Sequence, residues 1–157
     1  MKLVLATSNK GKLAEIAPIV QAFGFQALPQ SDFGFVDAEE SGLTFVENAL
    51  IKARHACMQT GLPALADDSG IIIDALNGAP GLISAHYAGV HGDSAGNIAK
   101  VLAELSQLEN PVRTARFYCC MVLLKHADDP QPIIAEGVWQ GEILSAPLGE
   151  NGFGYDP

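Results

Sequence analysis

Two groups of residues have the types that phosphate and metal chemistry needs, and the first is the segment Thr7-Ser-Asn-Lys-Gly-Lys12. It follows an apolar run and precedes a region of helical spacing, so it should connect a strand to a helix. Hydroxyls, an amide, two ammonium groups and the N–H groups of a helix start would together suit a polyphosphate. The alternative is a polar loop in which Ser8 or Asn9 only caps the helix. The spacing of a Walker A loop is absent.

The second group is acidic and comprises Glu39, Glu40, Glu47, Asp67 and Asp68. Mg²⁺ is usually held by one or two carboxylates together with substrate phosphates, so acids opposite a lysine-containing loop would complete a metal–nucleotide site. Two of these acids also have a purely structural interpretation. Glu47 would form a helix-capping box with Thr44, and Glu39 would be an ordinary solvated surface residue. Asp67-Asp68-Ser69-Gly70 is typical of a turn at a strand end, either an ordinary Asx turn or a place for catalytic carboxylates.

The remaining candidates give weaker signals. Gly149–Pro157 combines glycines with two aromatic residues, which favours either a base-stacking loop or a glycine-rich turn. The four histidines (His55, His86, His91 and His126) form no His-x-x-x-His pair, so none is predicted to bind zinc. Residue order leaves open a Ser–His–Asp hydrolase that uses Ser69, but the G-x-S-x-G motif of such enzymes is missing.

Hydrophobic periodicity predicts the elements that must position these residues. We expect strands at Lys2–Ala6, Ala64–Ala66, Ile71–Ile73, Arg116–Lys125 and Pro132–Trp139, and helices over Leu13–Phe23, from Thr44 to Gly61, and from Asp93 or Ser94 to Leu105. Pro18 should kink the first helix or delay its start. This order predicts a single α/β domain over residues 1–157, with a mixed sheet and helices packed on it.

Composition narrows the classes of function. Hydrophobic residues make up 48% and charged residues 17% of the chain, which indicates a packed core rather than disorder. The formal net charge of −9 disfavours binding to nucleic acid. No apolar run approaches the roughly 20 residues of a membrane span, so no membrane partner is expected. Cys57, Cys119 and Cys120 form no disulfide or metal pattern, which favours a reducing, cytoplasmic location.

Five motifs taken in order carry a specific resemblance: Ala6-Thr-Ser-Asn-Lys-Gly-Lys12, Glu39-Glu-Ser-Gly-Leu-Thr-Phe-Val-Glu-Asn-Ala49 with Lys52-Ala53, Ala66-Asp-Asp-Ser-Gly70, Gly78-Ala-Pro-Gly81 and Gly152-Phe-Gly-Tyr-Asp-Pro157. Over its whole length the chain resembles the inosine/xanthosine triphosphate pyrophosphatase family. The resemblance implies a homodimeric α/β protein with an elongated mixed sheet and a nucleotide cleft. It also implies Mg²⁺-dependent hydrolysis of deaminated purine nucleoside triphosphates to the monophosphate and pyrophosphate, which cleanses the nucleotide pool.

The same resemblance implies a role for each matching residue. Thr7, Ser8, Asn9, Lys10, Gly11 and Lys12 would bind the triphosphate, and Asn9 and Lys12 are the leading candidates among them. Glu40 and Asp68 would serve the metal, and Asp68 would also be the general base. Ser69 would touch the substrate. Phe153 would stack on the purine, while Gly154, Tyr155 and Asp156 would shape the base and ribose pocket.

Two departures from the family pattern affect these expectations. Relatives usually continue beyond this Phe-Gly-Tyr-Asp-Pro segment into a substrate-binding lysine and a Ser-His-Arg motif, so we expect a C-terminally truncated member. Two alternatives to a pyrophosphatase of deaminated purine nucleotides therefore stay open. One is a pyrophosphatase of broader nucleotide preference, and the other is a catalytically incomplete subunit that only binds nucleotide. His86 stands where relatives commonly have arginine, which would make any cationic role there dependent on pH.

Overall fold

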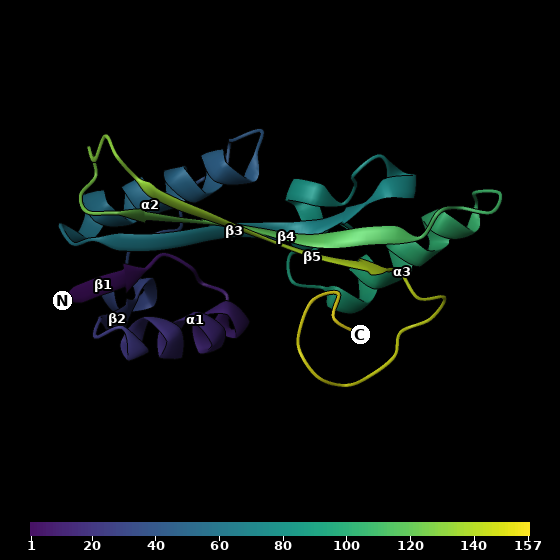
Figure 1. Cartoon of the computed structure of the whole chain (residues 1–157), viewed down its shortest axis with the longest axis horizontal. Coiled ribbons are helices and arrows are strands. Elements are labelled where there is room, and N and C mark those ends of the chain that lie inside the picture. Colours follow the sequence, from purple (N-terminus) through teal and green to yellow (C-terminus); the bar gives the residue numbers. More distant parts are fainter. The chain divides into compact units, whose positions relative to one another are not determined.

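The computed structural model describes all 157 residues, which form an α/β fold around a mixed five-stranded sheet. The strands are β1 (Lys2–Leu5), β2 (Gln26–Pro29), β3 (Ala64–Ile73), β4 (Thr114–Leu124) and β5 (Ile133–Glu142). They lie in the order β2-β1-β3-β4-β5 (Figure 1). The helices are α1 (Lys10–Ala22), α2 (Phe45–Thr60) and α3 (Ser94–Ser106), with short 3₁₀ helices η1 (Gln30–Phe33), η2 (Asp74–Leu76) and η3 (Gly81–His86). The predicted α/β class with a mixed sheet is confirmed.

The chain divides into two compact units. Unit 1 comprises Met1–Asp68 and Cys120–Glu136, and unit 2 comprises Ser69–Cys119 and Gly137–Pro157. Unit 1 therefore contains β1, β2, α1 and α2, whereas unit 2 contains α3, η2 and η3, and the three longer strands contribute residues to both. The predicted triphosphate loop, Glu40 and Asp68 belong to unit 1. A single domain over residues 1–157 stays a prediction.

Strand β1 forms the centre of unit 1. It pairs in parallel with β2, where Lys2 is opposite Gln26, and with β3, where Val4 is opposite Ala64. Parallel strands are covered on both faces and therefore read as continuous apolar runs. Leu3, Val4 and Leu5 are accordingly at most 1% exposed, and the apolar spacing of Lys2–Ala6 identified this strand correctly.

Strand β2 was absent from the sequence prediction. Its residues Gln26-Ala-Leu-Pro29 have no alternating pattern, and Pro29 cannot donate a ladder hydrogen bond. The strand forms because it lies at the sheet edge with β1 as its neighbour, where a terminal proline is tolerated. Figure 1 shows α1 beside β1 and β2, so this edge belongs to the packed body of unit 1.

Helix α1 begins earlier than Pro18 suggested. Asn9 is its N-cap, and the helix continues through Pro18 to Ala22, so of the two predicted effects of Pro18 the late start is wrong and the kink stays a prediction. Two apolar residues of the predicted helix are exposed, Ile19 at 59% and Phe23 at 78%. Phe23 is the C-cap, where helical spacing no longer directs the side chain inward.

The predicted ends of α2 are confirmed. The Thr44 hydroxyl accepts a hydrogen bond from the Glu47 N–H at 3.3 Å and donates one to the Glu47 carboxylate at 2.8 Å. The Leu43 N–H donates to the same carboxylate oxygen at 2.8 Å. At the other end Gly61 adopts a left-handed φ of 66°, which ends the helix without the steric cost of a side chain. These local signals place Asn48 and Lys52 on α2.

The segment Asp67-Asp68-Ser69-Gly70 corrects the sequence analysis. It forms no turn, because β3 runs without interruption from Ala64 to Ile73. Asp67 and Asp68 are buried in this strand, with 3% and 7% exposure. Both have a cationic partner within 4 Å, which compensates two charges that sequence reasoning placed in a turn at a strand end.

The later elements follow the prediction to within a few residues. Asp93 caps α3, and its carboxylate accepts a hydrogen bond from the Gly96 N–H at 3.0 Å. Asp129 fixes the turn between β4 and β5, where its carboxylate accepts the N–H groups of Lys125 and Gln131. Only residues 125–132 connect these neighbouring strands, a length that joins antiparallel partners. None of the helices is long and apolar enough to cross a membrane.

Candidate active site

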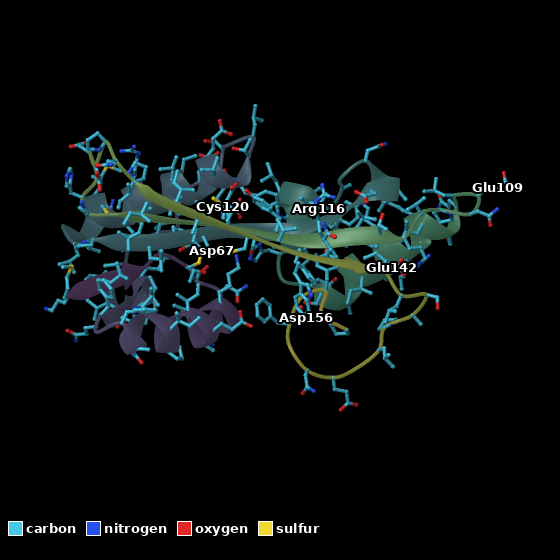
Figure 2. The ribbon with its side chains drawn as sticks, in the orientation of Figure 1. Asp67, Glu109, Arg116, Cys120, Glu142 and Asp156 are labelled. Carbon is cyan, nitrogen blue, oxygen red and sulfur yellow. The ribbon has the colours of Figure 1, made fainter.

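Unit 1 brings the loop before α1 to the buried carboxylates of β3. The Lys12 ammonium lies 2.6 Å from the Asp67 carboxylate, and the two side chains are 20% and 4% exposed. The loop is fixed by its own side chains, because the Thr7 hydroxyl accepts the Asn9 N–H and the side-chain amide oxygen of Asn9 accepts the Lys12 N–H, both at 3.1 Å. Asp67, labelled in Figure 2, therefore anchors the start of α1 to the sheet.

A second group of charges lies between α2 and β3. The Lys52 ammonium is 3.2 Å from a Glu40 carboxylate oxygen and 3.7 Å from a carboxylate oxygen of Asp68. The side chain of Lys52 is 16% exposed, and that of Asp68 is 9% exposed. Asn48, one helical turn before Lys52, also forms a side-chain hydrogen bond with Asp68. Glu40 and Asp68, predicted to act together, are thus joined by a shared lysine.

The side chains of the two adjacent aspartates lie on opposite faces of the sheet. Successive residues of a strand point to opposite faces, and Asp67 and Asp68 are consecutive in β3. Asp67 contacts the lysine at the start of α1, whereas Asp68 contacts the lysine and the amide of α2. A turn would have exposed both carboxylates to one solvent-filled space. The strand instead gives each of them a separate environment.

Burial raises the pKa of Asp68 above its ordinary value. The positive charge of Lys52 and the hydrogen bond from Asn48 oppose this shift, while the negative charge of Glu40 adds to it. A buried carboxylate with a raised pKa is a stronger base than one in water, and such groups are concentrated at catalytic sites. The environment therefore suits Asp68 to accept a proton.

The oxygen donors around Lys52 determine which metal ion the site could hold. No cluster of three or more histidine, cysteine, aspartate or glutamate side chains could hold a metal ion without other ligands. Mg²⁺ seldom needs one, because it keeps several waters and commonly uses one or two carboxylates with substrate phosphates. Glu40 and Asp68 supply two carboxylates beside one lysine, and this oxygen chemistry fits Mg²⁺.

The structure also describes the other residues of the predicted triphosphate loop, but it does not assign them a binding role. Ser8 and Lys10 are exposed, and Gly11 lies in the first turn of α1. Asn9 caps helix α1, which is the structural role that the sequence left open for this residue. Capping does not remove its amide donor or the N–H groups of the first turn, which are the features that suit an anion.

Sequence reasoning missed Asn48 and Lys52 as members of the site. Both were present in the motif that carried the resemblance, but neither was assigned a role. Their spacing contained the signal, because residues four apart on a helix occupy the same face. With the capping box fixing the start of α2, an amide and an ammonium were predictable on one face of this helix.

Unit 2 contains the predicted base-binding residues. The Asp156 carboxylate accepts a hydrogen bond from the Phe153 N–H at 2.9 Å and closes a tight turn. A side chain on Gly152, whose φ is 80°, would overlap the same carboxylate, so the turn requires glycine. Phe153 is 39% exposed and lines an apolar groove of about 620 Å³ together with Ile98 and Leu102 of α3. Figure 2 labels Asp156.

Tyr155 anchors this turn to the core of unit 2. Its hydroxyl donates to the Ser84 carbonyl at 2.8 Å, and its ring packs against the buried cluster around Ile73. The Ser84 hydroxyl in turn donates to the Gly81 carbonyl at 2.6 Å and accepts the Ile71 N–H at 3.0 Å. These contacts explain why the segment holds one shape despite its glycines.

His86 and Ser69 also lie in unit 2. His86 ends η3 and is exposed, and its ring stacks on that of His91 with centroids 6.4 Å apart. Ser69 follows Asp68 directly in β3.

Comparison with known proteins gives consistent matches along the chain. Residues 3–157 match the Ham1 family. A protein named dITP/XTP pyrophosphatase from Thioalkalivibrio sulfidiphilus is 58% identical over 157 residues, which is 100% of this chain and 80% of that protein. Among solved structures, a HAM1 protein from Coxiella burnetii has a TM-score of 0.92 at 51% identity, with 100% of this chain and 80% of that chain covered. A nucleoside-triphosphatase or dITP/XTP pyrophosphatase from Mycobacterium abscessus has a TM-score of 0.83 at 41% identity, with 100% of this chain and 82% of that chain covered.

Proposed function

Because the chain belongs to the Ham1 family, we propose that it hydrolyses deaminated purine nucleoside triphosphates to the monophosphate and pyrophosphate. Inosine, deoxyinosine and xanthosine triphosphates are the proposed substrates. The observation that carries this proposal is the cluster in which Lys52 joins Glu40 to the buried base candidate Asp68. The activity is that of a hydrolase acting on phosphoric anhydride bonds, and removal of these nucleotides would cleanse the nucleotide pool.

The loop from Thr7 to Lys12 is proposed to bind the triphosphate. Lys10, Lys12 and the N–H groups at the start of α1 supply positive charge and donors for phosphate oxygens. Thr7, Ser8 and Asn9 add side-chain donors, and Gly11 lets the backbone of the first turn approach the ligand closely. Lys12 would exchange part of its contact with Asp67 for the substrate, so Asp67 holds the lysine in place before binding.

Asp68 is proposed to be the general base. Its carboxylate takes a proton from a water molecule, and the water oxygen forms a bond to the α-phosphorus. The bond from that phosphorus to the bridging oxygen breaks, and pyrophosphate leaves with the bonding electrons. A positioned base contributes about 10²- to 10⁴-fold in rate, and the raised pKa of Asp68 increases its strength. Lys52 balances charge beside it, which favours an ionised carboxylate before the reaction.

Glu40 and Asp68 are the residues that would hold Mg²⁺, as the chemistry of their donors allows. When bound, the ion supplies neutralisation of phosphate charge and stabilises the leaving pyrophosphate. The ammonium of Lys52 supplies positive charge to the same two carboxylates from the protein side.

Phe153, Gly154, Tyr155 and Asp156 are proposed to contact the nucleoside part of the substrate. The half-exposed ring of Phe153 suits stacking on a purine. Gly154 has a left-handed φ of 64°, and Asp156 fixes the turn on which the ring is carried. Tyr155 acts through its anchor on Ser84, and Ser69 is proposed to contact the substrate beside the base Asp68.

A pyrophosphate-release assay across a nucleotide panel tests the function. The purified chain should release pyrophosphate from inosine and xanthosine triphosphates with Mg²⁺, and much less from adenosine and guanosine triphosphates. Glu40→Gln should lower this turnover, whereas the control Glu39→Gln, on an exposed neighbour, should not. Equal turnover of all purines would support the alternative of broader preference. Nucleotide binding without release would support the alternative of an incomplete subunit and contradict the proposal.

A homodimer in the cytoplasm is proposed from the family resemblance and from the cysteines, since none of the three forms a disulfide. The negative net charge supports the proposal that nucleic acid is not a partner. Light scattering of the purified chain tests the dimer, and a mass close to 16.5 kDa at micromolar concentration would contradict it.

A further inference from the structure

Asn48 lies in the first turns of α2 and is buried, with 4% exposure. An asparagine side chain has a donor end and an acceptor end, and burial makes either costly to leave without a partner. Two groups of unit 1 occupy these ends: the backbone N–H of Gly42 and the carboxylate of Asp68. Asn48 therefore connects two segments that meet at the candidate site.

The partners determine which way the amide points. The Gly42 N–H donates to the Asn48 carbonyl oxygen at 2.8 Å. The amide nitrogen is consequently the group that donates to the Asp68 carboxylate. A flipped amide would place two donors together at Gly42 and two acceptors together at Asp68. The orientation is therefore fixed by chemistry at both ends.

Packing around Gly42 makes this connection rigid. A Cβ atom on Gly42 would lie 2.6 Å from the Asn48 carbonyl oxygen and 2.6 Å from the Cβ atom of Glu47. No side chain fits there, so the backbone of Gly42 rests directly against α2. Glu40 is only two residues earlier, which means that the contact also restrains the segment that carries Glu40.

We propose that Asn48 is a positioning residue for hydrolysis, because its amide holds the Asp68 carboxylate and the Glu40 segment in one fixed arrangement. The inference rests on the proposed function, in which Asp68 is the base. Lys52 also contacts Asp68, but its ammonium group lies 3.7 Å away at the end of a long flexible side chain. The same ammonium group also contacts Glu40. The short, buried amide of Asn48 fixes the direction of the carboxylate, and a displacement of about 1 Å can cost about 10²-fold in rate.

The test uses two substitutions that differ at one end of the amide. Asn48→Asp keeps an acceptor for the Gly42 N–H but replaces the donor facing Asp68 by an oxygen. Asn48→Leu has similar size and removes both hydrogen bonds. Both should lower kcat for inosine triphosphate by about 10²-fold. In Asn48→Leu, KM and the dissociation constant of a non-hydrolysable nucleotide analogue should change by less than about threefold, because substrate binding is not the step affected.

Asn97 provides a matched control in unit 2. It is 3% exposed on α3, accepts the Ala88 N–H at 2.7 Å and donates to the Ala85 carbonyl at 3.2 Å. Asn97→Asp should lower the unfolding temperature but leave kcat within about twofold of the natural chain. Amide hydrogen exchange at Gly42 should stay slow in Asn48→Asp and become faster in Asn48→Leu.

The possible outcomes distinguish a wrong positioning role for Asn48 from a wrong proposed function. If both Asn48 variants keep kcat within about twofold of the natural chain, or if their loss lies in KM alone, the positioning role is wrong. If Asn48→Leu does not fold, Asn48→Asp decides, since it retains the bond to Gly42. Absence of turnover by the natural chain with every deaminated purine triphosphate would instead contradict the proposed function.

Discussion

Asp67 and Asp68 are neighbours in β3, but their carboxylates bind lysines from different helices. Lys12 of α1 lies 2.6 Å from Asp67, and Lys52 of α2 lies 3.7 Å from Asp68. The alternation of a β-strand produces this separation, and it gives the two carboxylates different tasks. Asp67 holds Lys12 of the loop proposed to bind phosphate, whereas Asp68 lies with Glu40 and Asn48 in the proposed reaction site.

Asp68→Asn should abolish most turnover and stabilise the fold. Loss of a general base should lower kcat by about 10²- to 10⁴-fold. Because burial raises the pKa of Asp68, its contribution to stability is present below the unfolded pKa and is lost as pH rises through the folded pKa. Near pH 7 the variant should therefore unfold at a higher temperature than the natural chain, and in acid the difference should disappear. Calorimetry at both pH values measures this, and a lower unfolding temperature at pH 7 would contradict it.

Asp67→Asn should have the opposite effect on stability. The substitution leaves Lys12, whose side chain is 20% exposed, without its carboxylate partner and should cost about 1–3 kcal/mol. Turnover should decrease mainly through a higher KM, because the lysine of the phosphate loop is less well held. Denaturant unfolding and steady-state kinetics check this prediction. Equal behaviour of the two asparagine variants would show that the neighbouring aspartates are not separated in function.

Tyr155→Phe should affect nucleotide binding more than chemistry. It removes the hydroxyl that donates to the Ser84 carbonyl at 2.8 Å, so the turn carrying Phe153 loses its anchor. Stability should fall by about 0.5–1.5 kcal/mol, and KM should rise several-fold with little change in kcat. Tyr87→Phe is the matched control, since Tyr87 belongs to the same buried cluster and its hydroxyl donates to the Glu104 carboxylate. A rise in KM of the same size in the control would show that general loosening, not the anchor, is responsible.

Ionisation of the tyrosines should be delayed in the folded chain. Burial raises the pKa of both Tyr87 and Tyr155 to about 12, with the hydrogen bond to Glu104 adding to the effect at Tyr87. A raised phenol pKa stabilises the fold below the ordinary value near 10, and this stability is lost as pH rises towards 12. Absorbance at about 295 nm should show these phenols ionising together with alkaline unfolding. A normal titration of all tyrosines with the fold intact would contradict the described packing.

Local signals predicted most of the elements. The capping box of Thr44 and Glu47, the Asp93 cap and the apolar run of β1 are each determined within a few neighbouring residues, and all were confirmed. Strand β2 and the continuity of β3 depend on partners far along the chain. Asp67 can lie inside a strand only because Lys12 reaches it from α1, and no property of the segment itself reveals that contact.

The candidate site, like the fold, was predictable only in part from local sequence signals. Motif resemblance identified Glu40 and Asp68 as partners, and the structure brings both to Lys52. The roles of Asn48 and Lys52 were missed because they depend on which face of α2 meets β3. That face is a consequence of packing, although the spacing of four residues did place the two side chains together.

Hydrolysis in water enriched in oxygen-18 reports which phosphorus the water attacks. Inosine triphosphate should yield inosine monophosphate carrying the label and pyrophosphate without it, as Asp68 directs water to the α-phosphorus. Label in pyrophosphate or in inorganic phosphate, detected by mass spectrometry or phosphorus NMR, would contradict it.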